Sequence, residues 1–159
     1  MTAHRTTRID YRGVFWFPVG PDDMWETIEH FDLFESWWAW LRDFDTDSDH
    51  LVAGNVLHGT VIPPVPYRLR LDIRLESSRP PQVVEATVDG DVRGVAAVRL
   101  APVDGGTEVT AVWSLDMRSG PLRLAALVAY PLMRWGHDRV VEMAVAGFRR
   151  QALGDTTPS

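Results

Sequence analysis

Strict alternation in the segment "YRLRLDIRLE", residues 67–76, constrains the fold of this chain more than any other feature. Apolar side chains occupy every second position, and charged side chains occupy the positions between them. This period of two is typical of a β-strand with one buried face and one face in water. A slip of one residue would exchange the two faces completely. The pattern predicts that Leu69, Leu71 and Ile73 lie inside, and that Arg68, Arg70 and Arg74 are solvated.

The same alternation returns in "DVRGVAAVRL" and "TEVTAVWSLDM", and more loosely in "QVVEATVDG" and "GNVLHGTVI". The turn sequences "DGD" at Asp89–Asp91 and "PVDGG" at Pro102–Gly106 join consecutive runs, as expected of antiparallel hairpins. We therefore predict a meandering antiparallel sheet. The inward positions are Val92, Gly94, Ala96, Val98 and Leu100 in one run, and Val109, Ala111, Trp113, Leu115 and Met117 in the next.

The N-terminal part predicts a strand followed by two short helices. Residues 7–17 are rich in β-branched and aromatic side chains, and a Pro/Gly break then precedes two acidic residues suited to a first helical turn. Met24, Trp25 and Ile28 can share one face of the first helix. The segment "DLFESWWAWL" indicates a second short helix, and the polar segment "RDFDTDSDH" is expected to form a loop.

The C-terminal part predicts one long helix from Pro121 to about Leu153, with Ser119 as its cap. Pro131 is expected to bend it. A single domain spanning 7–153 follows, with 1–6 and 154–159 as flexible termini. One helical stripe faces the sheet: Leu122, Ala129, Met133, Gly136, Val140, Ala144 and Gly147. Arg134, Trp135, Asp138 and Glu142 are expected to point away.

Composition excludes several classes of function. The chain has no cysteine, which rules out thiolate chemistry and iron–sulfur clusters, and its five histidines have no metal-ligand spacing. No metal or cofactor is therefore expected. The net charge of −6 disfavours a nucleic-acid partner. Neither a signal peptide nor a membrane-spanning run is legible, so we expect a cytoplasmic protein.

The order of elements resembles the START-like, helix-grip superfamily, also called SRPBCC, from about Ile9 to Leu153. Within this superfamily, the chain is similar to actinobacterial proteins described as polyketide cyclase/dehydrase-like. Five segments carry this similarity: "WWAWL", "PPVPYRLR", "GDVRG", "GGTEV" and "RWGHDRVVE…FRRQAL". The resemblance implies an α+β fold in which a curved antiparallel sheet grips the long helix around an apolar cavity. It does not imply a particular reaction.

Three tryptophans stand within four residues at Trp37, Trp38 and Trp40, in a chain that has seven in all. In the START-like arrangement they lie at a rim, where they could gate an apolar ligand. They could equally plug one end of a filled core. Trp37 and Trp38 cannot face the same way on a helix, so at least one of the three is expected to be partly exposed.

His137 and Tyr67 are the candidate catalytic residues. An imidazole near a cavity could act as a general acid or base, although His137 could instead form a structural hydrogen bond to the sheet or a loop. Asp138 is expected to point outward and to pair with Arg134 on the surface, so that it cannot readily orient His137 as the carboxylate of a triad would.

Three functions stay open: binding or transport of a lipid, polyketide or other small hydrophobic molecule; a polyketide aromatase/cyclase; and an interaction protein with a filled core. A homodimer is compatible with each of them. The inward stripes carry almost no ionisable group, which favours binding over catalysis. The predicted ligand-binding residues are Trp37, Trp38, Trp40, Tyr67, Ile73, Ala96, Trp113, Met117, Met133, His137 and Val140.

Overall fold

A computed structural model describes residues 8–65, 67–118 and 120–152. The two predicted flexible termini, the proposed cap Ser119 and the last predicted helical residue, Leu153, lie outside the described residues. Among the residues described, no helix has both the length and the apolar character needed to cross a membrane.

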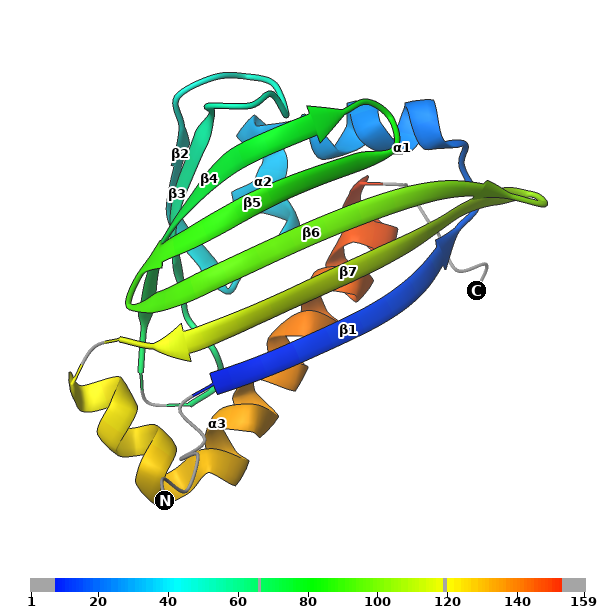
Figure 1. Ribbon diagram of the computed structural model, residues 1–159. Coiled ribbons are helices and arrows are strands. Elements are labelled where there is room, and N and C mark those ends of the chain that lie inside the picture. Colours follow the sequence, from blue (N-terminus) through cyan, green and yellow to red (C-terminus); the bar gives the residue numbers. More distant parts are fainter. Residues whose placement is uncertain (1–7, 66, 119, 153–159) are drawn as a thin grey trace, which may run out of the picture.

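Seven antiparallel strands form one curved sheet (Figure 1). They are β1 (Arg8–Phe17), β2 (Leu41–Thr46), β3 (Val56–Val61), β4 (Leu69–Arg79), β5 (Val83–Gly90), β6 (Val92–Val103) and β7 (Gly106–Met117). The spatial order is β1-β7-β6-β5-β4-β3-β2, so β1 and β2 are the two edges. Consecutive strands from β2 to β7 are neighbours, which is the predicted meander.

Helical segments cover the concave side of the sheet. They are α1 (Pro21–Ile28), η1 (Phe31–Leu33), α2 (Phe34–Trp37), α3 (Gly120–Gly147) and a π-helical turn, η2 (Phe148–Ala152). Figure 1 shows α1 at one end of the sheet and α3 running behind it, with the first turns of α3 extending past the strand ends. Met24 and Trp25 are buried on one face of α1, as predicted.

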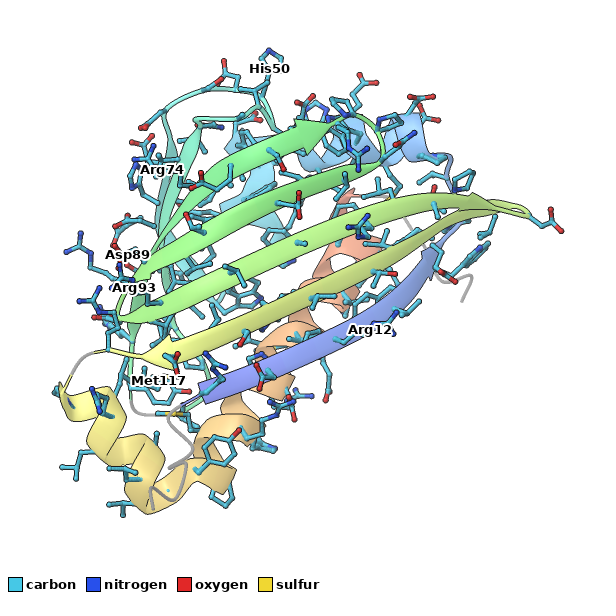
Figure 2. The ribbon with its side chains drawn as sticks, viewed as in Figure 1. Arg12, His50, Arg74, Asp89, Arg93 and Met117 are labelled. Carbon is cyan, nitrogen blue, oxygen red and sulfur yellow. The ribbon has the colours of Figure 1, made fainter. Side chains whose placement is uncertain are left out.

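The predicted strand register is confirmed. The side chains of Arg68, Arg70 and Arg74 are exposed, and Figure 2 shows Arg74 and Arg93 at the outer surface of the sheet. The inward positions 92–100 and 109–117 are buried or half-buried. Both predicted hairpin turns contain a glycine with positive φ, Gly90 at 118° and Gly105 at 78°, a backbone conformation that suits glycine.

The polar segment expected to be a loop instead begins with strand β2, so that prediction was wrong. Leu41 and Phe44 are three residues apart, which does not match a period of two. An irregularity between Arg42 and Asp45, with Asp43 at a φ of 53°, brings both apolar side chains inward. As an edge strand, β2 can leave its other side chains in water. The second short helix also ends earlier than expected, at Trp37.

The long helix bends as Pro131 predicts. Ala129, two residues before the proline, has non-helical angles of φ −136° and ψ 43°. Proline cannot donate the intrahelical hydrogen bond and its ring clashes with the preceding turn, so the helix kinks there. On both sides of the bend, residues of the predicted inner stripe are buried: Leu122, Met133, Gly136 and Gly147.

Two buried clusters stand at opposite ends of the space between sheet and helix. The first contains Met24, Trp25, Phe34, Trp37 and Phe148, together with residues of the strands. The second contains Ile9, Val88, Val92, Met117, Leu122, Ala126 and Met133. Ile73 packs against both clusters. The space between them is the candidate functional site.

Candidate functional site: an apolar cavity between sheet and helix

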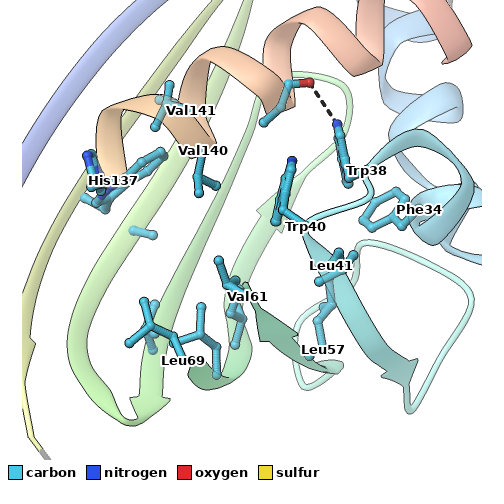
Figure 3. Close-up of a pocket in the computed structure, with 18 of the residues that line it drawn as sticks. Phe34, Trp38, Trp40, Leu41, Leu57, Val61, Leu69, His137, Val140 and Val141 are labelled. Atoms are coloured by element: carbon cyan, nitrogen blue, oxygen red, sulfur yellow. Dashed lines mark hydrogen bonds between the residues drawn. The ribbon is translucent and has the colours of Figure 1, made fainter. Parts of the chain in front are cut away.

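A cavity of about 500 Å³ lies between the concave face of the sheet and α3 (Figure 3). Its walls come from all seven strands and from α1, α2, α3 and η2. Pockets that hold drug-sized ligands have volumes of about 300–1,000 Å³. The cavity is therefore large enough for a small organic molecule.

The inward stripes explain why this space is apolar. The alternating positions of β4, β6 and β7 bring Leu71, Ile73, Val98 and Leu115 to the wall. These side chains are half-buried, although they lie on the inner face of the sheet. Part of their surface stays accessible because these side chains border the open space of the cavity. Small residues at Gly59, Ala96 and Ala144 add room.

The tryptophan segment closes the wall near the end of α3. Trp37 is only 7% exposed and packs edge to face on Phe148 at a centroid distance of 5.6 Å. Trp38 and Trp40 are half-buried and stack on each other at 5.4 Å, at a tight turn in which the amide of Leu41 donates to the backbone oxygen of Trp38. The expectation that some tryptophan surface stays exposed is met by these two.

Close approach between the tryptophan segment and α3 depends on Gly147. A Cβ there would lie 2.6 Å from the carbonyl oxygen of Trp37 and 2.9 Å from Cδ1 of Trp38. The indole Nε1 of Trp38 donates to the backbone oxygen of Ala144 at 2.8 Å, as Figure 3 shows. The absent side chain thus lets the indole reach the helix.

Polar groups of the wall that lack a hydrogen-bond partner among the described residues include Nε1 of Trp40 and the hydroxyl of Tyr67. Nε1 of Trp40 is buried and unpaired, and Figure 3 shows it directed toward α3. No described residue hydrogen-bonds the hydroxyl of Tyr67, and burial raises the pKa of this phenol above its ordinary value of 10.0. Tyr67 therefore stays neutral near pH 7. Both groups are hydrogen-bond donors.

His137 lies at the edge of the cavity with both ring nitrogens engaged. Nε1 of Trp113 donates to Nε2 of His137 at 2.9 Å, and Nδ1 of His137 lies 2.9 Å from Oδ1 of Asp138. Because an indole can only donate, Nε2 must accept, and Nδ1 carries the proton toward Asp138. Tyr11 stacks on Trp113 at 4.6 Å and completes the cluster.

The expectation that Asp138 could not orient His137 was wrong. Adjacent helical residues point about 100° apart, but both side chains are long enough to curl toward each other at the helix surface. Asp138 also pairs with Arg134 at 3.4 Å, as predicted. Burial lowers the pKa of His137 below 6.5, an effect opposed by the bond to Asp138. Of the two hypotheses for His137, the structure therefore matches the structural one, because the imidazole is hydrogen-bonded to Trp113 on strand β7.

Ten of the eleven predicted ligand-binding residues line the cavity, and their role in binding stays a prediction. Met133 is the exception. It is 3% exposed and belongs to the buried cluster around Leu122 and Ala126. The two candidate catalytic residues both reach the wall, but no hydrogen bond joins His137 to Tyr67 in the described part of the chain.

Sequence reasoning missed the contributions of β2 and β3. Leu57, Gly59 and Val61 alternate along β3 and line the cavity, a pattern that "GNVLHGTVI" carries only weakly. His58, between them, also borders the cavity, but its imidazole bonds Asp72 at 2.7 Å and Asp47 at 3.4 Å. Both bonds raise the pKa of His58, and the bond to Asp72 has the larger effect. Asp72 lies directly opposite His58 in the strand register.

Fold and cavity together define a helix-grip protein, in which a curved antiparallel sheet and a long C-terminal helix enclose an apolar space. No protein-family model matches the sequence, and no curated protein sequence matches it. Solved structures do resemble it. The protein TTHA0849 from Thermus thermophilus has a TM-score of 0.73 and 11% identity, with 94% of this chain and 100% of that chain covered.

Two further structures carry more informative descriptions. Ara h 8.0201 has a TM-score of 0.55 and 11% identity, covering 71% of this chain and 80% of that one. BexL, described as a di-domain ARO/CYC from the BE-7585A biosynthetic pathway, has a TM-score of 0.67 and 8% identity; the match covers 96% of this chain and 52% of that chain. At these identities the likeness shows the fold alone.

Proposed function

We propose that this protein binds a small hydrophobic molecule in the cavity between the sheet and α3. The observation that carries the proposal is the cavity itself, about 500 Å³ in volume and bordered by apolar side chains from every strand. Such a space does not fit the alternative of a filled core, because protein interiors are normally packed with few voids larger than a water molecule. The burial of apolar ligand surface would supply the driving force.

The polar groups of the wall narrow the chemistry of the ligand. No carboxylate or guanidinium belongs to the described residues that line the cavity, and His137 is held neutral by burial and by the donor Trp113. The imidazole of His58, which also borders the cavity, is engaged by Asp72 and Asp47. A charged ligand would lose its hydration without gaining a partner. The ligand is therefore a neutral lipid, polyketide or similar molecule, and a hydroxyl or carbonyl oxygen on it could accept from Tyr67 or Trp40.

The test is a titration with a neutral fluorescent hydrophobic probe such as Nile red. Ala96 lines the cavity, and Ala96→Phe would fill part of it; Ala97→Phe places the same ring on the other face of the same strand. We expect Ala96→Phe to abolish probe binding with little loss of stability, because the ring occupies existing space. Ala97→Phe should bind as the wild type does.

Equal probe binding by wild type and Ala96→Phe, together with a lower melting temperature of that variant, would contradict the proposal. A filled core would lose roughly 1–3 kcal/mol to overpacking. Native mass spectrometry of protein purified from its own host would then identify any small molecule that co-purifies.

A polyketide aromatase/cyclase activity is the alternative, and the likeness in fold to a protein described as an ARO/CYC supports it. In that case His137 and Tyr67 would move protons. Both nitrogens of His137 are engaged, however, so the imidazole would have to give up Trp113 before it could accept a proton from a substrate. Binding is therefore ranked first. The relation to actinobacterial polyketide cyclase-like proteins, the cytoplasmic location and the homodimer stay predictions.

A further inference from the structure

The first turns of α3 present an apolar face that nothing in the described structure covers. Of the twelve large hydrophobic side chains that are exposed in the described residues, five lie on α3; Val128 is 79% exposed and Leu124 63%. We call these five the outer apolar face of α3: Leu124, Leu127 and Val128 before the bend, and Leu132 and Trp135 after it.

This part of α3 is apolar on two opposite sides. Leu122, Ala126 and Met133 are buried against Ile9 and Met117 at the end of the sheet, while the outer apolar face is turned to solvent. Leu124, Leu127 and Val128 follow the i, i+3, i+4 spacing of one helical surface. A helix that is apolar all round is normally covered on all sides. The inner face packs on the end of the sheet, so a binding partner is expected for the outer face.

Charge indicates what that partner is. The chain carries a net charge of −6, yet the twenty-one residues from Met117 to His137 contain three arginines and no Asp or Glu. Arg118 pairs with Asp89, and Arg134 pairs with Asp138. Arg123 is exposed beside the outer apolar face and has no partner among the described residues. The face is therefore apolar with a free positive charge at its margin.

We infer that the outer apolar face of α3 docks the protein on an anionic phospholipid surface. A helix with an apolar face and arginine beside it lies in the membrane interface, where the apolar side chains enter the acyl boundary and the cations meet anionic headgroups. Trp135 is a residue type that favours this boundary. Figure 1 shows the first turns of α3, before the bend, projecting past the strand ends.

A second copy of the chain fits this face less well. Two-fold contacts bring the same patch of both subunits together, so Arg123 of each copy would face a segment that contains no carboxylate. Anionic headgroups supply the missing partner. The docking site is distinct from the cavity and does not depend on what the cavity binds.

Flotation with lipid vesicles tests the inference. Wild-type protein is mixed, at low ionic strength, with vesicles of phosphatidylcholine alone or of phosphatidylcholine with phosphatidylglycerol. We expect binding to the anionic vesicles, weaker binding to the neutral ones, and a decrease as salt is added. The double variant Leu127→Glu/Val128→Glu loses the burial of two apolar side chains and gains repulsion, so its partitioning should fall roughly a hundredfold or more.

The matched control is Val95→Glu/Val112→Glu, which changes the net charge equally at two exposed valines on the outer face of the sheet. It should retain binding to anionic vesicles. The milder variant Val128→Ser serves if the double variant does not fold, as judged by circular dichroism. Probe binding in the cavity should be unchanged in all of these proteins, which separates failure of the docking site from failure of the proposed ligand binding.

Three results would overturn the inference: no vesicle binding by the wild type, equal loss of binding in the variant and its control, or a dimer in sedimentation velocity that Leu127→Glu/Val128→Glu dissociates while vesicles are not bound. The last result would assign the face to a second copy.

Discussion

At the scale of single residues, the cluster of His137, Trp113 and Asp138 couples a titratable group to the attachment of α3. Trp113 lies on β7 and His137 on α3, so the 2.9 Å bond between them joins the sheet to the helix. The bond requires an unprotonated Nε2, because indole offers only a donor. Protonation of His137 therefore costs this contact, in line with the lowering of its pKa by burial.

Stability should consequently fall in acid through His137. Its pKa in the folded protein lies below the ordinary value of 6.5, so the unfolded chain takes up the proton first as the pH falls. The contribution is fully present above pH 6.5 and is lost as the pH falls through the folded-state pKa. We expect the unfolding free energy of the wild type to decrease more between about pH 7.5 and 5 than that of His137→Gln.

Urea unfolding at each pH measures this difference, and the other titrating groups cancel because both proteins share them. Identical pH profiles would contradict the prediction. Nuclear magnetic resonance of the imidazole nitrogens provides an independent check, since the structure requires the tautomer protonated at Nδ1.

Trp38 and Trp40 form a natural matched pair at the same scale. Their rings stack on each other and both are half-buried, but only Trp38 makes a hydrogen bond, to Ala144, within the described part of the chain. Trp38→Phe and Trp40→Phe lose similar ring area. Trp38→Phe should therefore be less stable than Trp40→Phe by about 0.5–1.5 kcal/mol, the usual net value of one hydrogen bond. Chemical denaturation followed by circular dichroism gives both values, and a reversed order would show that the bond is not formed.

At the scale of elements, strand β4 contributes to two different environments on one face. Leu75 is 4% exposed in the first cluster, whereas Leu71, four residues earlier, borders the cavity. Leu75→Ala opens a new void and should cost about 2–5 kcal/mol. Leu71→Ala only enlarges a void that already exists, so it should cost clearly less and should alter probe affinity. Equal destabilisation by the two substitutions would indicate that the space beside Leu71 is filled.

At the scale of the whole molecule, one continuous sheet runs beneath both buried clusters. The cavity separates the clusters, but Ile73 packs against each of them and the strands β4 to β7 reach both ends. We therefore expect a single cooperative unfolding transition, in agreement with the predicted single domain from 7 to 153. Tryptophan fluorescence, which reports mainly on the first cluster, and far-ultraviolet circular dichroism should give the same midpoint. Two separate midpoints would mean that the clusters unfold independently.

The sequence alone was sufficient for strands β4 to β7 and for the faces they present, but not for the edge strand β2. The pleat fixes a period of two, so the alternation around Leu71 and Ala96 determined which side chains turn inward, and Pro131 determined the bend of α3. These are local properties, because neighbouring residues along the chain impose them.

The tertiary structure alone decided the cavity and its polar contacts. A void is the difference between the space that a curved sheet and a bent helix enclose and the volume of the side chains there, and no local pattern encodes that difference. Met133 lies outside the cavity because the buried cluster around Leu122 and Ala126 encloses it. The imidazole of His137 also accepts from Trp113, which lies twenty-four residues away on β7. Contacts of this kind depend on distant elements, which only the folded chain brings together.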